Sequence, residues 1–220
     1  FTGLLNDPSN EHHIPGWKVT VGYPGGSEDF DMSASRVGKF TGQLRDEFGL
    51  QIVDSPEAVA EQCDLVFITA VDGRAHRALY DRIAKYKRPT FIDKPFTCSL
   101  PDARAIFAAA DEATAPVMSC SSMRYADNLT EAMAREDLGR LVGVDAFGPM
   151  AIKPPIPGLY WYGIHTVELL VTVMGAGCKQ VTATNTEEAD LLACEWEAGR
   201  MASIRGQRNA ESGPDADVVV

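Results

Sequence analysis

The sequence lacks the features that mark membrane proteins, disulfide-rich proteins and nucleic-acid-binding proteins. Its apolar runs are short, and those near 65–68 and 169–174 cannot cross a bilayer. The five cysteines form no C-x-x-C pair, which predicts reduced thiols in a cytoplasmic protein, with no disulfide framework and no metal site. A net charge of −11 leaves no basic excess for a nucleic-acid partner. We therefore expect a soluble protein that contacts neither nucleic acid nor membrane.

The sequence also lacks the motifs that most directly mark a nucleotide site or a targeting segment. The glycine-rich run Pro24–Ser27 follows a predicted strand at 18–23, yet it matches neither G-x-G-x-x-G nor the P-loop, so a plain turn is the first interpretation. No initiator methionine or signal peptide opens the sequence, and 217–220 reads as a strand just beginning. We therefore expect both ends to be incomplete.

Short apolar strands alternate with helices in the first half of the sequence. The predicted strands are 18–23, 51–53, 65–69, 90–92 and 116–119, and helix signals lie between them. This alternation predicts βαβ units, and therefore a parallel sheet with helices on both faces. We assign residues 1–122 to an α/β dinucleotide-binding domain of the Rossmann type.

The pattern changes after about residue 122. Strands are predicted at 141–147, 180–185, 191–197 and 201–205, with a tight hairpin at Ala198-Gly199 and one apolar helix at 163–174. Residues 123–220 are therefore predicted to form an α+β domain on an open, mostly antiparallel sheet. Some of its strands are apolar at consecutive positions, which predicts that one sheet face packs on the helix and the other is covered in an oligomer.

The stretch from Pro89 to Leu100 carries the first candidate functional residue. A short strand ends abruptly at Asp93-Lys94-Pro95, and a helix capped by Ser99 follows. Lys94 therefore lies at the carboxyl end of a parallel strand, where open α/β sheets bind ligands. An ordinary surface lysine at a strand end is the alternative interpretation.

Three local patterns occur together in a fixed order. They are the D-K-P triplet at 93–95, a histidine six residues after Ala70 (His76), and the stretch Tyr160–Leu170, in which a histidine opens an apolar helix. Together they resemble the glucose–fructose oxidoreductase / inositol dehydrogenase (Gfo/Idh/MocA) family of NAD(P)-dependent oxidoreductases, over nearly the whole sequence. The triplet is similar to the E-K-P motif of that family.

This resemblance implies hydride transfer between NAD or NADP and a hydroxyl-bearing carbon of a sugar or polyol. It implies that Lys94 contacts both cofactor and substrate and that His165 exchanges the proton at the reacting oxygen. Pro95 and His76 would lie at the cofactor. The family also implies a homo-oligomer, a dimer or tetramer, formed through the open sheet.

The sequence departs from the family pattern at three places. The predicted strand at 18–23 behaves like the second strand of the family, so we expect the first strand and its glycine-rich loop to be missing. No acidic residue ends this strand, and Ser27 and Arg36 would suit the 2′-phosphate of NADP, unless they are a turn serine and a helix-start arginine. Trp161 stands where the family has an aspartate.

Two questions of function stay open at this level. Trp161 favours an alternative in which the protein is a non-catalytic, cofactor-sensing regulator of the same fold; a lyase or hydrolase on this fold is a third interpretation. The substrate itself cannot be read from the sequence. Trp161, Tyr162 and Arg124 would line its pocket, or pack at a subunit contact.

The resemblance also predicts the geometry of the site. We expect a cis Lys94–Pro95 bond, which only about 5–6% of X-Pro bonds adopt. We further expect Lys94 and His165 to face one cleft between the two domains.

Overall fold

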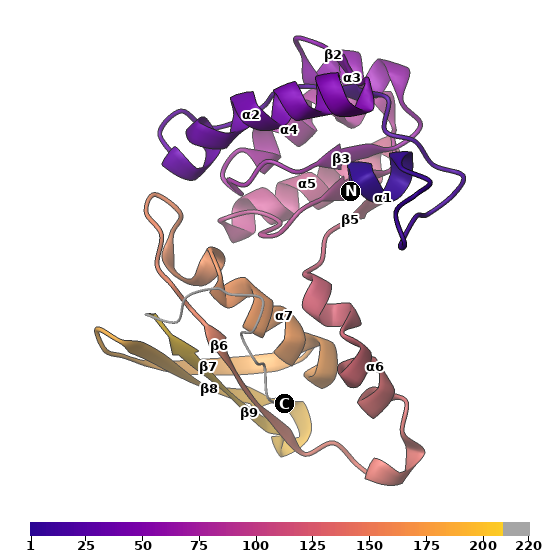
Figure 1. Cartoon of the computed structure of the whole chain (residues 1–220). Coiled ribbons are helices and arrows are strands. Elements are labelled where there is room, and N and C mark those ends of the chain that lie inside the picture. Colours follow the sequence, from indigo (N-terminus) through magenta and orange to yellow (C-terminus); the bar gives the residue numbers. More distant parts are fainter. Residues whose placement is uncertain (209–220) are drawn as a thin grey trace. The chain divides into compact units, whose positions relative to one another are not determined.

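The computed structural model describes residues 1–208. The chain forms two compact units that divide between Ser119 and Cys120 (Figure 1), where the sequence predicted a boundary at 122–123. The strand start predicted at 217–220 lies outside the described residues.

The first unit alternates strands and helices, and every strand pair in it is parallel. Its order is α1 (Thr2–Asn6), β1 (Val21–Gly22), α2 (Asp31–Phe48), β2 (Gln51–Ile52), α3 (Pro56–Gln62), β3 (Val66–Ile68), α4 (His76–Ile83), β4 (Thr90–Ile92), α5 (Leu100–Ala113) and β5 (Val117–Met118), with a 3₁₀ turn at Ala84–Tyr86. This arrangement confirms the predicted Rossmann-type parallel fold. The predicted first strand is shorter than expected, because only Val21 and Gly22 pair with β2.

Local signals in the sequence set the helix ends. The Ser55 and Ser99 hydroxyls accept the N–H groups of Ala58 and Asp102, so both are N-caps. Gly49 ends α2 in the left-handed conformation with φ 65°, which a residue without Cβ adopts readily. The predicted cap at Ser99 is confirmed, and all three helix ends rest on chemistry within one turn of the helix.

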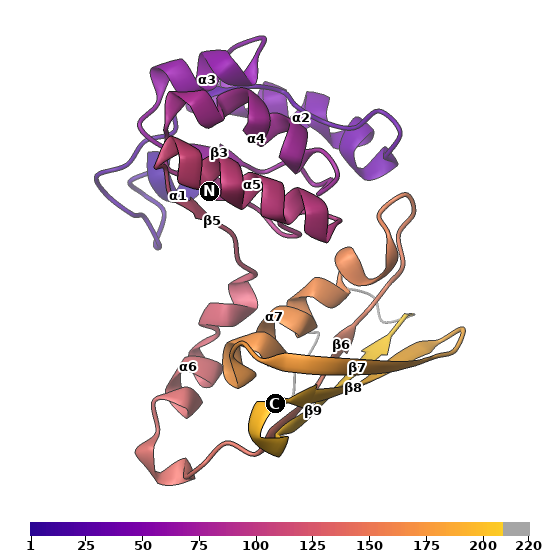
Figure 2. The same ribbon diagram turned by 180° about the vertical axis from the view of Figure 1, so that it is seen from behind.

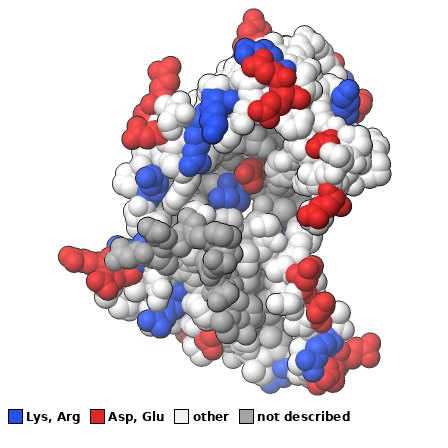
Figure 3. All heavy atoms as spheres, in the orientation of Figure 1, with Lys and Arg blue, Asp and Glu red and all other residues white. Residues whose placement is uncertain are grey.

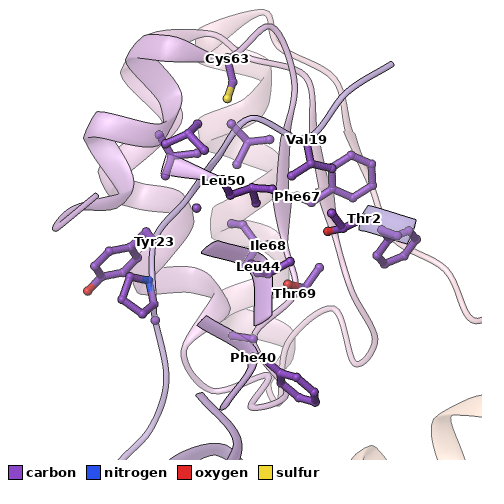
Figure 4. Close-up of a pocket in the computed structure, with 18 of the residues that line it drawn as sticks. Thr2, Val19, Tyr23, Phe40, Leu44, Leu50, Cys63, Phe67, Ile68 and Thr69 are labelled. Carbon is purple, nitrogen blue, oxygen red and sulfur yellow. The ribbon is translucent and has the colours of Figure 1, made fainter. Parts of the chain in front are cut away.

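The parallel strands form two separate sheets. One contains β1 and β2, and the other has the order β3-β4-β5. Between β1 and β3 lies a cavity of about 1010 Å³, lined by residues of both strands and of α2 (Figure 4). The expectation that a strand of the family is missing beside 18–23 stays a prediction.

The core of the first unit lies on one side of the β3-β4-β5 sheet. Figures 1 and 2 show α4 and α5 side by side there, and the buried side chains between them and the strands are Ala60, Val66, Ile68, Tyr80, Ile83, Ile92, Ile106 and Ala110. On the opposite side, Phe67 is 39% exposed and lies against the rings of Phe1 and Phe91. The sequence predicted burial on both faces. That prediction is wrong for Phe67, because its neighbour α1 is only five residues long.

The second unit is a four-stranded sheet with one main helix. Its elements are η2 (Ser122–Tyr125), α6 (Asp127–Met133), η3 (Glu136–Leu138), β6 (Gly143–Pro149), η4 (Gly158–Tyr160), α7 (Gly163–Met174), β7 (Cys178–Asn185), β8 (Ala189–Trp196), η5 (Glu197–Gly199) and β9 (Met201–Gln207). The strand order is β6-β9-β8-β7, in which β6 runs parallel to β9 and the other pairs are antiparallel. This confirms the predicted mostly antiparallel sheet. The predicted hairpin is confirmed at Ala198 and Gly199, with φ 58° and 70°.

The two faces of this sheet differ in polarity. One face packs on α7, and its core includes Leu170, Met174 and Cys194. The other face exposes Leu191 (50%) and Met201 (55%) beside polar side chains such as Asp145 and Ser203, which are hydrogen-bonded to each other. The predicted second apolar face is therefore mixed, since apolar and polar residues alternate between neighbouring strands.

Adjacent residues of α7 test how far this core stabilises the second unit. Leu170 is 2% exposed and Val171 is 42% exposed. We expect Leu170→Ala to lower the free energy of unfolding by about 2–5 kcal/mol, because truncation leaves a cavity. Val171→Ala, the matched control, should change it by less than about 0.5 kcal/mol. Urea denaturation of both variants measures the difference, and equal losses would contradict the assigned core.

Candidate functional site

The Asp93-Lys94-Pro95 turn is fixed to the carboxyl end of the parallel sheet. The Asp93 N–H donates to the Ile68 carbonyl at the end of β3 (2.9 Å), and the Asp93 carboxylate accepts the Lys94 N–H (2.8 Å). The Lys94–Pro95 peptide bond is cis, which confirms the prediction. Lys94 thus occupies the sheet edge where open α/β folds bind ligands.

Gly73 is a residue of this site that sequence reasoning missed. A Cβ atom on Gly73 would lie 2.7 Å from Pro95 Cγ, 3.0 Å from the Pro95 carbonyl oxygen and 3.1 Å from Cys98 Sγ. Two of these contacts are with the proline ring and with main chain, and neither can move aside without a cost in free energy. The loop after β3 therefore packs directly against the turn that carries Lys94. The only signal in the sequence was a glycine between two charged residues after a strand.

The buried side chain of His76 links the loop after β3 to the turn after β4. Its side chain is fully buried, with Nε2 2.7 Å from the Ala70 carbonyl oxygen and Nδ1 3.1 Å from the Phe96 carbonyl oxygen. Both ring nitrogens are engaged by main chain. These contacts make His76 a support for the turn at Lys94, and its expected place at the cofactor stays a prediction.

Three charged side chains form an ion-pair network in the loops near the carboxyl end of the parallel sheet. The Arg74 guanidinium contacts Asp72 (2.8 Å) and Asp29 (2.9 Å), and it thereby ties the loop after β3 to the loop before α2. Asp72 is 1% exposed. Its burial is the largest influence and raises the pKa of the carboxyl, but hydrogen bonds from Arg74 and Ser27 together outweigh it and hold the pKa below its usual value.

The two residues expected at a 2′-phosphate have different surroundings. Ser27 binds Asp72 through its hydroxyl and donates its N–H to Ser33 Oγ (2.9 Å). A neighbouring carboxylate repels a phosphate, so this position does not favour the role expected of Ser27, which stays a prediction. Arg36 is exposed on α2 and lines the cavity between β1 and β3.

Cys98 is a half-buried thiol close to the Lys94 turn. Its partial burial raises the pKa of the thiol to about 11, so it is protonated at neutral pH and is a poor nucleophile. Among residues 1–208 none of the five cysteines forms a disulfide, and no cluster of histidine, cysteine and carboxylate side chains is suited to a metal ion.

His165 lies in the first turn of α7, and Ser121 orients it. His165 Nδ1 is 2.6 Å from Ser121 Oγ, and Ser121 is 1% exposed. The Ser121 hydroxyl also accepts the Met123 N–H (3.2 Å), which holds it in place. The imidazole therefore has a fixed orientation, although the aspartate expected from the family is absent. Sequence reasoning missed Ser121, because it lies far from His165 in the chain.

The three expected substrate residues surround this histidine differently. The Tyr162 ring lies 5.3 Å from the His165 ring and 6.1 Å from that of Trp161. Trp161 is 8% exposed, so little of its surface is left for a substrate. Arg124 forms an ion pair with Glu168 on α7, which docks η2 against that helix. Tyr162 thus fits the expected role better than Arg124 or Trp161.

Lys94 belongs to the first unit and His165 to the second. The cleft that they are expected to share therefore remains a prediction.

Figure 3 shows acidic and basic side chains interspersed on the visible surface of both units. Within the described part of the chain, no helix combines the length and apolarity needed to span a bilayer.

Residues 30–120 match the sequence profile of an oxidoreductase family with an NAD-binding Rossmann fold. No curated protein sequence gives a significant match.

Several solved structures share the fold at low sequence identity. An oxidoreductase from Agrobacterium radiobacter in complex with NAD⁺, L-tartaric acid and magnesium is 17% identical, with a TM-score of 0.72 over 93% of this chain and 64% of that one. A putative myo-inositol dehydrogenase from Sinorhizobium meliloti is 16% identical, with a TM-score of 0.71 over 93% and 65%. GenD2 from gentamicin A biosynthesis, in complex with NAD, is 20% identical, with a TM-score of 0.68 over 83% and 58%. The chain therefore spans about 60% of the length of the structures it matches.

The close approach at Gly73 gives a stability test with an internal control. We expect Gly73→Ala to lower the free energy of unfolding by about 1–3 kcal/mol, because the new methyl group overlaps Pro95. Gly38, in the middle of α2, has no atom within 4 Å of the position that a methyl group would occupy. Gly38→Ala should therefore raise stability by about 0.5–1 kcal/mol through lower chain entropy in the unfolded state. Thermal unfolding measures the stability of both variants. A Gly73→Ala variant more stable than wild type would contradict the close contact between Gly73 and Pro95.

The Asp72 network predicts a specific dependence of stability on pH. Because the folded pKa of Asp72 lies below its unfolded value, its stabilising contribution is present above about pH 4 and disappears as the pH falls through the folded pKa. We expect Asp72→Asn to be less stable than wild type by about 1–3 kcal/mol at pH 7. This gap should narrow below about pH 4. Denaturant unfolding at several pH values measures it, and a gap that widens in acid would contradict the assignment.

Proposed function

Because residues 30–120 match the oxidoreductase family with an NAD-binding Rossmann fold, we propose that the full-length protein transfers a hydride between NAD(P) and a substrate carbon that bears a hydroxyl group. We further propose a sugar or polyol as the substrate. The proposal rests on Lys94 and His165 as the chemical groups.

The placement of Lys94 carries this proposal. Its turn is fixed by the Asp93 hydrogen bond to β3, by Gly73 against Pro95, and by His76 between Ala70 and Phe96. Three independent contacts thus hold one cationic residue at the carboxyl edge of a parallel sheet. Rigid support of this kind is what a group needs to act on charge that develops during a reaction.

Each side chain has a defined role in this proposal. The nicotinamide, when bound, accepts or gives the hydride. His165, oriented by Ser121, takes the hydroxyl proton during oxidation and returns it during reduction. The Lys94 ammonium donates a hydrogen bond to the same oxygen and stabilises its negative charge. Tyr162, whose ring lies beside His165, contacts the body of the substrate.

The described residues fit part of a dinucleotide site. Lys94 and the loop after β3 supply its nicotinamide end, and Arg36 on α2 is placed to bind the 2′-phosphate of NADP. A glycine-rich turn that opens a helix for the pyrophosphate is not present among residues 1–208.

The burial of Trp161 supports a second candidate function. A largely buried indole at the position of the family aspartate has no carboxylate that could accept a proton from a substrate. A regulator that binds NAD(P) and performs no chemistry is consistent with it. In either case we propose a cytoplasmic homo-oligomer, since none of the five cysteines forms a disulfide and the open sheet exposes Phe147, Leu191 and Met201.

The functional test separates cofactor binding from turnover. Full-length protein is titrated with NADH and NADPH by nicotinamide fluorescence and then assayed against a panel of polyols and sugars. We expect binding of one cofactor and turnover of at least one substrate. Binding with no turnover on any substrate would favour the regulator, and no binding would contradict both functions.

Lys94 is tested in the same assays. We expect Lys94→Ala to lower kcat by about 10²–10³-fold, because the developing charge on oxygen loses its donor. Cofactor affinity should change by less than about 3-fold, since the main role of Lys94 is at the reacting oxygen. Lys153→Ala removes an equal charge from an exposed loop and serves as the control. A loss of cofactor affinity with normal kcat would assign Lys94 to binding alone.

A further inference from the structure

The hydrogen-bonding capacity of the buried Ser121 hydroxyl group can be counted. The side chain is 1% exposed, and a hydroxyl group donates one proton and accepts through two lone pairs. One lone pair of Ser121 Oγ accepts the Met123 N–H (3.2 Å), and the other contact of this oxygen is with His165 Nδ1 (2.6 Å). Within residues 1–208 no further hydrogen bond involves this hydroxyl group, so Nδ1 is the one acceptor that it has for its proton.

The donated Ser121 proton determines which nitrogen of His165 carries the proton of the neutral ring. In neutral imidazole one nitrogen donates a hydrogen bond and the other accepts one. Because Nδ1 accepts from Ser121, the ring proton is on Nε2. The opposite tautomer would place the proton on Nδ1 and leave the buried hydroxyl proton without an acceptor, which disfavours that tautomer by about 10-fold or more.

The charged groups on the elements that pack against α7 do not oppose this donation. Glu168 lies three residues after His165, on the same side of the helix, but its carboxylate is bound by Arg124 of η2, so the two charges balance. The charged residues of β6 and β9, Asp145 and Arg205, lie on the face of the sheet that points away from α7. The other titratable side chains near the first turn of α7 are three phenols and a thiol: Tyr125, Tyr160, Tyr162 and Cys120.

We propose that Ser121 is a positioning residue that holds neutral His165 in the Nε2–H tautomer, and that this tautomer slows alcohol oxidation at alkaline pH but leaves carbonyl reduction at acid pH unchanged. The kinetic part of this inference rests on the proposed function, since it concerns the proton of the same reaction. In the Nε2–H form the histidine meets a ligand oxygen as a hydrogen-bond donor. A carbonyl oxygen, which can only accept, fits that form.

Oxidation needs the tautomer that Ser121 disfavours. In that direction the substrate O–H bond breaks, its proton goes to Nε2, its electron pair forms the C=O bond, and the C–H hydride goes to the nicotinamide. Nε2 takes this proton only when the ring proton of His165 is on Nδ1, which holds for about a tenth or less of the neutral form.

Reduction begins from a different protonation state of His165. It runs the same transfer backward from the imidazolium form, in which both nitrogens carry a proton and no tautomer has to be selected. At acid pH, where the imidazolium form prevails, Ser121 therefore has no tautomer to disfavour. At any single pH the two directions still change together, because the protein does not alter the equilibrium of the reaction.

The tautomer is measured in the full-length protein without cofactor or substrate. Histidine labelled with ¹⁵N gives a ring spectrum by NMR in which a protonated nitrogen and a bare one differ clearly, and the signals that His165→Gln removes belong to His165. The spectrum is recorded above the pH at which this ring titrates. We expect the ring proton on Nε2, in about 10-fold or larger excess over the Nδ1 form.

Variants of Ser121 make the test specific. Ser121→Asp replaces the hydroxyl donor by a carboxylate, which only accepts, so the ring proton should move to Nδ1. Ser121→Thr keeps a hydroxyl group and should keep the Nε2 form. Ser122→Ala removes the exposed hydroxyl group next in the chain, and this matched control should also keep it. Ser121→Ala removes the donor without burying a charge and should mix the two forms, so it replaces Ser121→Asp if that variant fails to fold.

The kinetic consequence is measured on a substrate found in the turnover assay. We expect Ser121→Asp to raise the alkaline plateau of kcat for oxidation by about 10-fold, because the ring proton is then on Nδ1. The acid plateau of kcat for reduction should change by less than about 3-fold, since the histidine is imidazolium there in both proteins. Equal changes of the two plateaus would mean that Ser121 only supports the local fold, and would contradict the proposal.

Two spectroscopic results would overturn the proposal. One is a wild-type His165 with its proton on Nδ1. The other is an Nε2 form that persists in Ser121→Asp or Ser121→Ala, which would assign the tautomer to another contact. Failure of this inference and failure of the proposed function are distinguishable: a protein without turnover leaves the NMR result unchanged, and an unexpected tautomer leaves the cofactor titration and the turnover assay unchanged.

Discussion

The arrangement of the first unit depends on the close packing of the loop after β3 against the turn after β4. Gly73 lies so near Pro95 that no other residue fits without a shift of main chain. His76 and Asp93 reinforce the contact with hydrogen bonds to carbonyls on both loops. The position of Lys94 follows from these contacts, because the lysine has no freedom to leave the edge of the sheet without breaking them.

At the second candidate residue, His165, a hydrogen bond orients the side chain and an ion pair steadies the helix that carries it. Ser121 orients His165 and also accepts the N–H that begins η2, so one hydroxyl links the start of the second unit to its main helix. The Arg124–Glu168 ion pair strengthens that link. The family position that is usually an aspartate is a packed tryptophan here, and the serine orients the histidine instead.

The sequence pointed to candidate residues but not to the residues that position them. Lys94, His165 and the cis proline followed from motifs that resemble a known family, and the Rossmann-type order followed from the alternation of strands and helices. Gly73, Ser121 and the buried position of His76 were missed, since each depends on a contact with a distant segment. The expected ligand roles of Ser27 and Arg124 stay predictions, and in the structure both side chains contact acidic residues.

The sequence by itself determined the helix caps, the parallel and antiparallel halves and the residue types at the two candidate positions. These features rest on interactions within a few residues or on the period of apolar side chains. Only the tertiary structure decided that the parallel strands form two sheets, and that His76 supports a turn. Hydrogen bonds between strands and contacts between loops join residues far apart in the chain, and a local pattern carries no information about which of those partners are present.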